Sequence, residues 1–191
     1  MHLLVGLGNP GREYESTRHN AGFDALDRLA SSANATAFRE KFSGEYATGT
    51  LAGEPVVLLR PLTFMNLSGQ CVQPAAAFFK VPPANVIVLH DELDVPVGQL
   101  RAKVGGGHAG HNGLRDIQAK FGTPEFARVR IGIGRPGPGF KGSVADFVLS
   151  RLDAYERGQL DDAIARVQAI VEAFIAGKPD RAATLANSKS P

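Results

Sequence analysis

Short apolar runs alternate along this chain with segments whose apolar residues recur at helical spacing. Residues 3–7 and 86–89 are continuous apolar runs, the pattern of strands that are buried on both faces of a sheet. Residues 46–51 and 55–59 flank a short glycine-containing turn and predict a hairpin. Two further strands are predicted at 100–104 and 127–133.

The spacing of apolar residues predicts helices at about 20–32, from Asn66 or Ser68 to Phe79, at about 112–121 and at 154–176. Pro74 lies inside the second helix and predicts either a kink or a later start of the regular part. The polar chain after Lys178 and Pro179 predicts a loose tail from about residue 179.

Strands and helices that interleave in this way predict an α/β fold. We expect a three-layer single domain over residues 1–191, with a mixed, mostly parallel twisted sheet flanked by helices. The length of 191 residues and the 43% hydrophobic content suit one domain. A long apolar span and a signal-peptide pattern are both missing from the sequence, so the expectation is a soluble, cytoplasmic protein.

The formal net charge of +2 is unevenly distributed. Residues 98–142 carry a net charge of +6, whereas the rest of the chain sums to −4. The positive residues of this region are Arg101, Lys103, Arg115, Lys120, Arg128, Arg130, Arg135 and Lys141. Such a region favours the binding of a polyanion at one place, and a solvated basic face is the alternative. Cys71 is the single cysteine, which excludes an intramolecular disulfide and a cysteine-based metal cluster.

The segment GLGNPG, residues 6–11, fits the glycine pattern of dinucleotide-binding turns. In such a turn a helix begins at the glycines, and an acidic residue about 20 positions later holds the ribose. Here helical spacing begins only near Asn20, and the expected acidic strand end does not follow. The glycines are instead predicted to bend the chain sharply at the carboxyl end of a central strand, where open α/β sheets place their sites.

Polar side chains follow both apolar runs. They are Asn9, Tyr14, Arg18, His19 and Asn20 after the first run, and His90, Asp91, Glu92 and Asp94 after the second. If both strands are central and parallel, these groups meet at one edge of the sheet, where a carboxylate can orient a histidine as a proton acceptor. A nucleophile elbow is missing and Cys71 is predicted in a helix, so water is the expected nucleophile.

Asn66 and Asn112 each lie at a predicted helix start that follows a loop. Helix capping is one explanation for an asparagine at such a position. The functional alternative is that these amides position a water or stabilise an oxyanion without adding charge. Neutral donors of this kind suit a site that also admits a polyanion.

Four long motifs resemble the bacterial peptidyl-tRNA hydrolase family. They are GLGNPGREYESTRHNAGF (6–23), RPLTFMNLSGQCV (60–72), HDELDVPVGQLRAKVGGGHAGHNGLRDI (90–117) and RVRIGIGRP (128–136). The resemblance covers nearly the whole chain. It implies hydrolysis of the ester that joins a peptide to the terminal ribose of tRNA, without a metal or cofactor. It also implies a monomer that binds peptidyl-tRNA. Neither a membrane nor an obligate protein partner is expected.

The resemblance also implies roles for individual residues. His19 matches the catalytic base, and Asp91 matches the carboxylate that stabilises its proton-accepting form. Asn9 matches the position that distinguishes blocked from unblocked aminoacyl-tRNA. The residues that match positions around the peptide and the tRNA 3′ end are Tyr14, Phe64, Asn66 and Asn112, and Met65 beside them is expected to pack on the catalytic imidazole. The residues that match phosphate contacts are Lys103 and Arg130, with Lys141 and His111 as weaker matches.

Two rival functions remain open from the sequence. One is a non-catalytic RNA-binding relative of the intron-splicing type, which would ordinarily carry a transit peptide, whereas this sequence starts at Met1 without such an extension. The other is a metal-dependent hydrolase built on His90, Asp91, His108 and His111, whose spacing matches no known ligand pattern. Pro74 and the short loop GPGFKG (137–142) depart from the family pattern and leave the role of Lys141 open.

Overall fold

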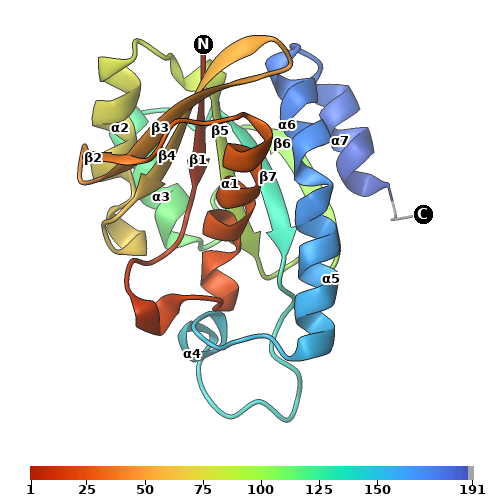
Figure 1. The fold of residues 1–191 in the computed structure, drawn as a ribbon. Coiled ribbons are helices and arrows are strands. Elements are labelled where there is room, and N and C mark those ends of the chain that lie inside the picture. Colours follow the sequence, from red (N-terminus) through yellow and green to blue (C-terminus); the bar gives the residue numbers. More distant parts are fainter. Residues whose placement is uncertain (189–191) are drawn as a thin grey trace.

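The computed structural model of the protein describes residues 1–188 and contains one twisted seven-stranded sheet (Figure 1). The strands are β1 (His2–Gly6), β2 (Arg39–Lys41), β3 (Gly44–Leu51), β4 (Glu54–Pro61), β5 (Val86–Glu92), β6 (Leu100–Val104) and β7 (Ala127–Gly132). Their order in the sheet is β2-β3-β4-β1-β5-β7-β6. The four central strands are parallel, and β2, β3 and β6 are antiparallel to their neighbours. The predicted mixed sheet and its hairpin are confirmed.

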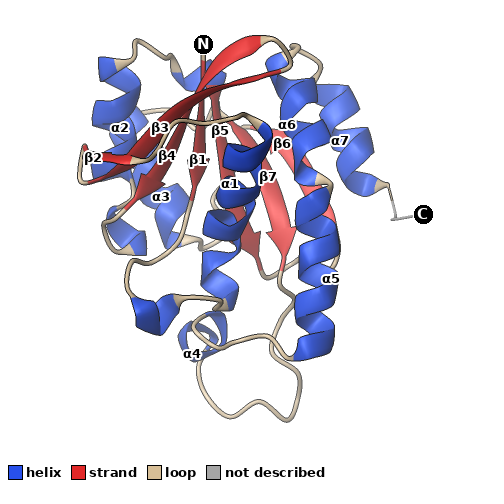
Figure 2. Cartoon of the chain, viewed as in Figure 1, coloured by secondary structure: helices blue, strands red, loops and turns tan. Residues whose placement is uncertain are grey.

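Helices cover both faces of this sheet and form a three-layer α/β domain (Figure 2). They are α1 (Ala21–Ser32), α2 (Gly69–Phe78), α3 (Asn112–Phe121), α4 (Val144–Val148), α5 (Ala154–Ala165), α6 (Val167–Ile175) and α7 (Pro179–Asn187). Short 3₁₀ turns include Arg12–Tyr14, Arg18–Asn20, Met65–Leu67 and Pro83–Asn85. None of the helices in residues 1–188 combines the length and apolarity that crossing a bilayer requires.

The continuous apolar run of β1 follows from its central place. Leu4 packs into the core shared with α1, α5 and α6, whereas Leu3 and Val5 pack into the core shared with α2 and α3. Successive side chains of a strand point to opposite faces, so a strand covered by helices on both sides is apolar at every position. All three side chains are fully buried.

Ser68 holds the N-cap position of the second helix, but the predicted capping by a side chain is wrong. Helix α2 begins at Gly69, and neither Asn66 nor Ser68 caps it with its side chain. The N–H of Gly69 instead donates to Oδ2 of Asp116 on α3, at 2.7 Å. Pro74 lies inside α2, which continues to Phe78. A capping partner that lies 47 residues away in the chain leaves no local signal.

The carboxyl-terminal helices also differ from the prediction. The expected helix 154–176 is interrupted at Arg166, whose guanidinium donates to the carbonyl oxygens of Gly98 and Ser188. The expected loose tail is wrong over 179–187, which form α7. This helix buries only alanines, Ala182 and Ala186, so its apolar spacing is weak in the sequence.

The glycines after β1 allow close packing as well as the bend. A Cβ at Gly6 would lie 2.5 Å from the carbonyl oxygen of Gly22, and a Cβ at Gly8 would lie 2.7 Å from the ring of Phe23. In the segment GLGNPG, Gly11 adopts a positive φ, at 110°. Helix α1 therefore lies directly against the ends of β1 and β5, and it begins at Ala21 rather than at the glycines.

We expect Gly22→Ala to lower the free energy of unfolding by about 1–3 kcal/mol, because the new Cβ would overpack a rigid backbone. It would lie 2.4 Å from the carbonyl oxygen of Leu89 and 2.6 Å from that of Leu7. Urea denaturation followed by circular dichroism measures the change. The matched control is Gly158→Ala in α5, where space is open and the helix should gain up to about 1 kcal/mol. A Gly22→Ala protein as stable as the wild type would contradict the close packing.

Candidate active site

Parallel pairing of β1 and β5 brings the two polar segments of the sequence together. Gly6 lies beside Leu89 in the sheet, so the chain after β1 and the end of β5 share one edge. A cavity of about 410 Å³ opens at this edge. Many of the predicted site residues line it, namely Asn9, His19, Phe64, Met65, Asn66, Asp91, His111 and Asn112.

Asp91 is the centre of the polar network in this cavity. Nδ1 of His19 lies 2.7 Å from one carboxylate oxygen, and Nε2 of His111 lies 2.7 Å from the other. Nδ1 of His111 accepts the N–H of Leu114 at 3.3 Å and so caps α3. A neutral imidazole has one donor and one acceptor nitrogen, so His111 donates its Nε2–H to Asp91. The resemblance gives His111 as a weaker match to a phosphate contact, and in the structure its Nε2 bonds the carboxylate of Asp91.

The charges of this network follow from burial and proximity. Burial of Asp91 disfavours its charge, but the imidazoles of His19 and His111 outweigh burial and hold the carboxyl pKa well below its usual range. Burial alone would lower the pKa of His19, but the charge of Asp91 and its hydrogen bond raise it above 6.5. His90 is fully buried beside His111, which lowers its pKa to about 3 and keeps it neutral.

Asn20 fixes the loop that presents Asn9. The N–H of Asn9 donates to Oδ1 of Asn20 at 2.8 Å, and Nδ2 of Asn20 donates to the carbonyl oxygen of Asn9 at 3.0 Å. Oδ1 of Asn9 accepts the N–H of Met65 at 2.8 Å, which leaves its Nδ2 as a donor at the cavity wall. Sequence reasoning named Asn20 without a role, because a reciprocal bond between residues 9 and 20 has no local pattern.

A smaller cavity of about 20 Å³ lies beside the first and is strongly basic. Lys103, Arg128 and Arg130 line it, together with Glu92. Nε and Nη2 of Arg130 bond Oε1 of Glu92 at 2.8 and 2.6 Å. Arg128 is fully buried, and its guanidinium holds the carbonyl oxygens of the glycine loop at Gly106 and Gly107. The basic region is therefore partly structural.

Two predicted residues lie apart from these cavities. Tyr14 ends the first 3₁₀ turn, where its carbonyl oxygen accepts the hydroxyl of Thr17. Lys141 is exposed in the loop before α4. Neither lines the 410 Å³ cavity.

Of the four residues of the metal-dependent alternative, Asp91 and His111 lie together, whereas the side chains of His90 and His108 bond elsewhere. His90 bonds the carbonyl oxygen of Asp91, and His108 accepts the N–H of Gly110. Over residues 1–188, the group with metal-ligand spacing is His19, Asp91 and His111, whose ligand atoms lie within 4.8 Å of one another. Both oxygens of Asp91 already accept hydrogen bonds there.

A three-layer α/β domain with a carboxylate-oriented histidine at a cavity wall has the arrangement of an enzyme that uses general-base catalysis. The sequence matches the family described as peptidyl-tRNA hydrolase over residues 3–191. It is 58% identical to peptidyl-tRNA hydrolase of Sorangium cellulosum over 93% of this chain and 80% of that protein. It is 49% identical to the same enzyme of Neisseria meningitidis serogroup A, over 98% and 97%.

The crystal structure of peptidyl-tRNA hydrolase from Acinetobacter baumannii has the same fold. It superposes with a TM-score of 0.92 at 42% identity and covers 100% of this chain and 96% of that one. The protein therefore belongs to the peptidyl-tRNA hydrolase family.

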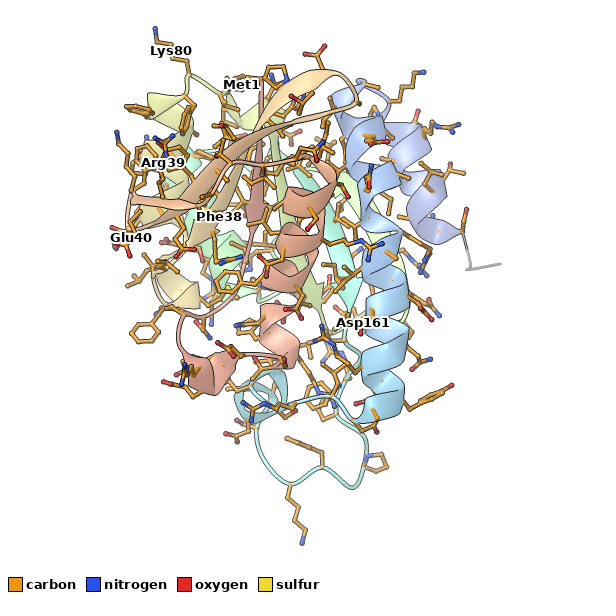
Figure 3. The ribbon with its side chains drawn as sticks, in the orientation of Figure 1. Met1, Phe38, Arg39, Glu40, Lys80 and Asp161 are labelled. Carbon is orange, nitrogen blue, oxygen red and sulfur yellow. The ribbon has the colours of Figure 1, made fainter. Side chains whose placement is uncertain are left out.

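We expect Asp91→Asn to move the titration of His19 from above pH 6.5 to below it. Without the carboxylate, burial acts alone and disfavours the imidazolium. NMR of the histidine ring protons measures the midpoint directly, even if the variant is inactive. The control is Asp161→Asn on α5 (Figure 3), a carboxylate paired with Arg157, which should leave the midpoint in place. An unchanged midpoint in Asp91→Asn would disprove the electrostatic role of Asp91.

Proposed function

We propose that the protein hydrolyses the ester between the peptide and the 3′-terminal ribose of peptidyl-tRNA, which recycles the tRNA. The observation that carries this proposal is the bond of His19 to buried Asp91 at the wall of a cavity lined by neutral amides. Membership of the peptidyl-tRNA hydrolase family supports the substrate.

His19 acts as the general base in this proposal. Asp91 holds the Nδ1–H of His19, so Nε2 is the free acceptor that takes a proton from the attacking water. The second bond of Asp91, to His111, fixes the carboxylate and with it the plane of the imidazole. The water oxygen bonds to the carbonyl carbon and forms a tetrahedral intermediate. The bond between this carbon and the ribose oxygen then breaks, and the imidazolium returns its proton to that leaving oxygen.

Asn66 and Asn112 bind the attacking water and the oxyanion in this proposal. Both lie at the cavity wall, near the starts of α2 and α3, and neither caps its helix. Their amides are free to hold the water and to donate to the developing oxyanion. A neutral donor adds no charge, so it does not lower the pKa of the base as a lysine would.

The amino group of the peptide and the 3′ end of the tRNA are assigned to different surfaces. The amide of Asn9 binds the blocked amino group of the peptide, and Phe64, 59% exposed beside the cavity, packs on the 3′ end. Met65 lines the cavity near His19. Tyr14 and Lys141 lie outside the cavity. Tyr14 is assigned a contact with the tRNA 3′ end, and Lys141 is assigned a contact with a phosphate.

Lys103 and Arg130 bind a tRNA phosphate in this proposal. The pKa of Lys103 is lowered by burial and by repulsion from the neighbouring charge of Arg130. Glu92 compensates only part of this charge from within the same cavity. An anion that contacts both cations relieves the repulsion and is bound for that reason.

We expect His19→Ala to slow release of the acyl group from N-acetyl-aminoacyl-tRNA by about 10²- to 10⁴-fold, because general-base catalysis is lost. Binding of deacylated tRNA should persist, since the phosphate contacts remain. Single-turnover hydrolysis and filter binding measure the two effects.

The control for this experiment is His2→Ala, at the amino end of β1, which lies at the opposite edge of the sheet. Near-wild-type turnover of His19→Ala would exclude the assigned base. Equal cleavage of unblocked aminoacyl-tRNA by the wild type would contradict the role of Asn9. A wild type that binds tRNA without hydrolysis would support the non-catalytic alternative, and loss of activity in excess chelator would support the metal-dependent one.

We expect Lys103→Ala and Arg130→Ala each to flatten the salt dependence of tRNA binding. The slope of log K against log salt should fall by about 0.7–0.9 for each lost phosphate contact. Titrations at several salt concentrations measure it. Lys178→Ala, an exposed lysine before α7, is the matched control. An unchanged slope in both variants would show that these cations do not contact phosphate.

A further inference from the structure

The residue before the proposed base is a buried arginine. Arg18 is only 7% exposed, although arginine is rarely buried in proteins. Its Nε donates to Oγ of Ser150 at 3.1 Å, and its Nη2 donates to Glu156 at 2.9 Å. Its guanidinium carbon lies 4.4 Å from the ring centroid of Phe147. The proposed reaction uses none of these contacts.

These contacts join three elements that are distant in the sequence. Arg18 begins the 3₁₀ turn that carries His19, Phe147 belongs to α4, and Glu156 belongs to the first turn of α5. The backbone adds to the connection, since the N–H of Arg18 donates to the carbonyl oxygen of Ser150 at 3.0 Å. In Figure 1, α4 lies below the start of α1, beside this turn.

Helix α4 forms an apolar wall of the large cavity. Val144, Ala145, Val148 and Leu149 line the cavity that also contains His19. The helix is only five residues long, and a helix this short has little stability of its own. Its buried residue is Phe147, the one that stacks on Arg18. The arginine therefore contacts the one residue that buries this wall against the rest of the protein.

A general stabilising role does not account for this arginine. Nη1 of Arg18 is buried without a hydrogen-bond partner among residues 1–188, and an unsatisfied buried donor is costly. An apolar side chain of similar size could join the two elements at a lower desolvation cost. What the guanidinium provides in addition is a fixed geometry, through two directional bonds and a stacking plane.

We propose that Arg18 is a positioning residue that fixes the α4 wall relative to His19. It thereby sets the distance between the base and the surface that contacts the acyl part of the substrate. The proposal rests on the proposed function, since it takes His19 as the base. Because the wall is apolar, the substrate group that contacts it is the side chain of the residue esterified to the tRNA.

The test combines kinetics with hydrogen exchange. We expect Arg18→Met to lower kcat/KM for N-acetyl-phenylalanyl-tRNA by roughly 10- to 100-fold, since small misplacement of reacting groups has effects of this size. The midpoint of the pH–rate profile should stay unchanged, because the bond of His19 to Asp91 remains. Arg18→Lys should recover part of the loss. Amides of residues 147–150 should exchange faster in Arg18→Met than in the wild type.

The matched control is Arg151→Met, which removes an exposed arginine at the same junction, where Nε donates to the carbonyl oxygen of Glu15 at 3.3 Å. It should have wild-type kinetics and exchange. Phe147→Leu removes the same contact from the side of α4 and should lower kcat/KM to a similar extent. The double variant with Arg18→Met should lose no more of kcat/KM than either single variant. Phe147→Leu also carries the test if Arg18→Met does not fold.

A folded Arg18→Met protein with wild-type kcat/KM, or losses that multiply in the double variant, would overturn the proposal. So would unchanged exchange in residues 147–150. A wild type without hydrolytic activity would instead refute the proposed function, and the exchange experiment would then still decide whether Arg18 fixes α4.

Discussion

The buried carboxylate of Asp91 is the constraint on which the rest of the site depends. An anion that is 2% exposed is tolerated only if donors satisfy it, and His19 and His111 supply one bond to each oxygen. These histidines come from a turn after β1 and from the loop before α3. Both segments must therefore fold onto the end of β5, which closes the cavity at this edge of the sheet.

The end of β5 also connects two different electrostatic environments. Asp91 belongs to the large cavity, whose walls are mostly amides and apolar groups. Glu92, the next residue, lines both cavities and holds Arg130 in the small basic one. The proposed water activation and the proposed phosphate binding require opposite conditions, because a nearby cation would lower the pKa of the base. Because Asp91 and Glu92 are adjacent on one strand, the two environments have a fixed position relative to each other.

Much of the fold and the central pair of the site could be predicted from the sequence. The apolar runs of β1 and β5 indicated central strands, and their pairing confirms that His19 and Asp91 meet at one edge. Two of the differences from the prediction depend on distant contacts. They are the start of α2, which depends on Asp116, and the break at Arg166, which donates to Gly98.

The sequence by itself determined the sheet, the family and the polar groups that follow each strand, because apolar spacing and turn residues act over a few positions. Only the tertiary structure decided what those groups do. His111 bonds the carboxylate of Asp91, Arg128 holds a loop, and Asn20 fixes Asn9. Each assignment depends on hydrogen bonds between segments that folding brings together, and these bonds have direction and distance that a linear pattern does not encode.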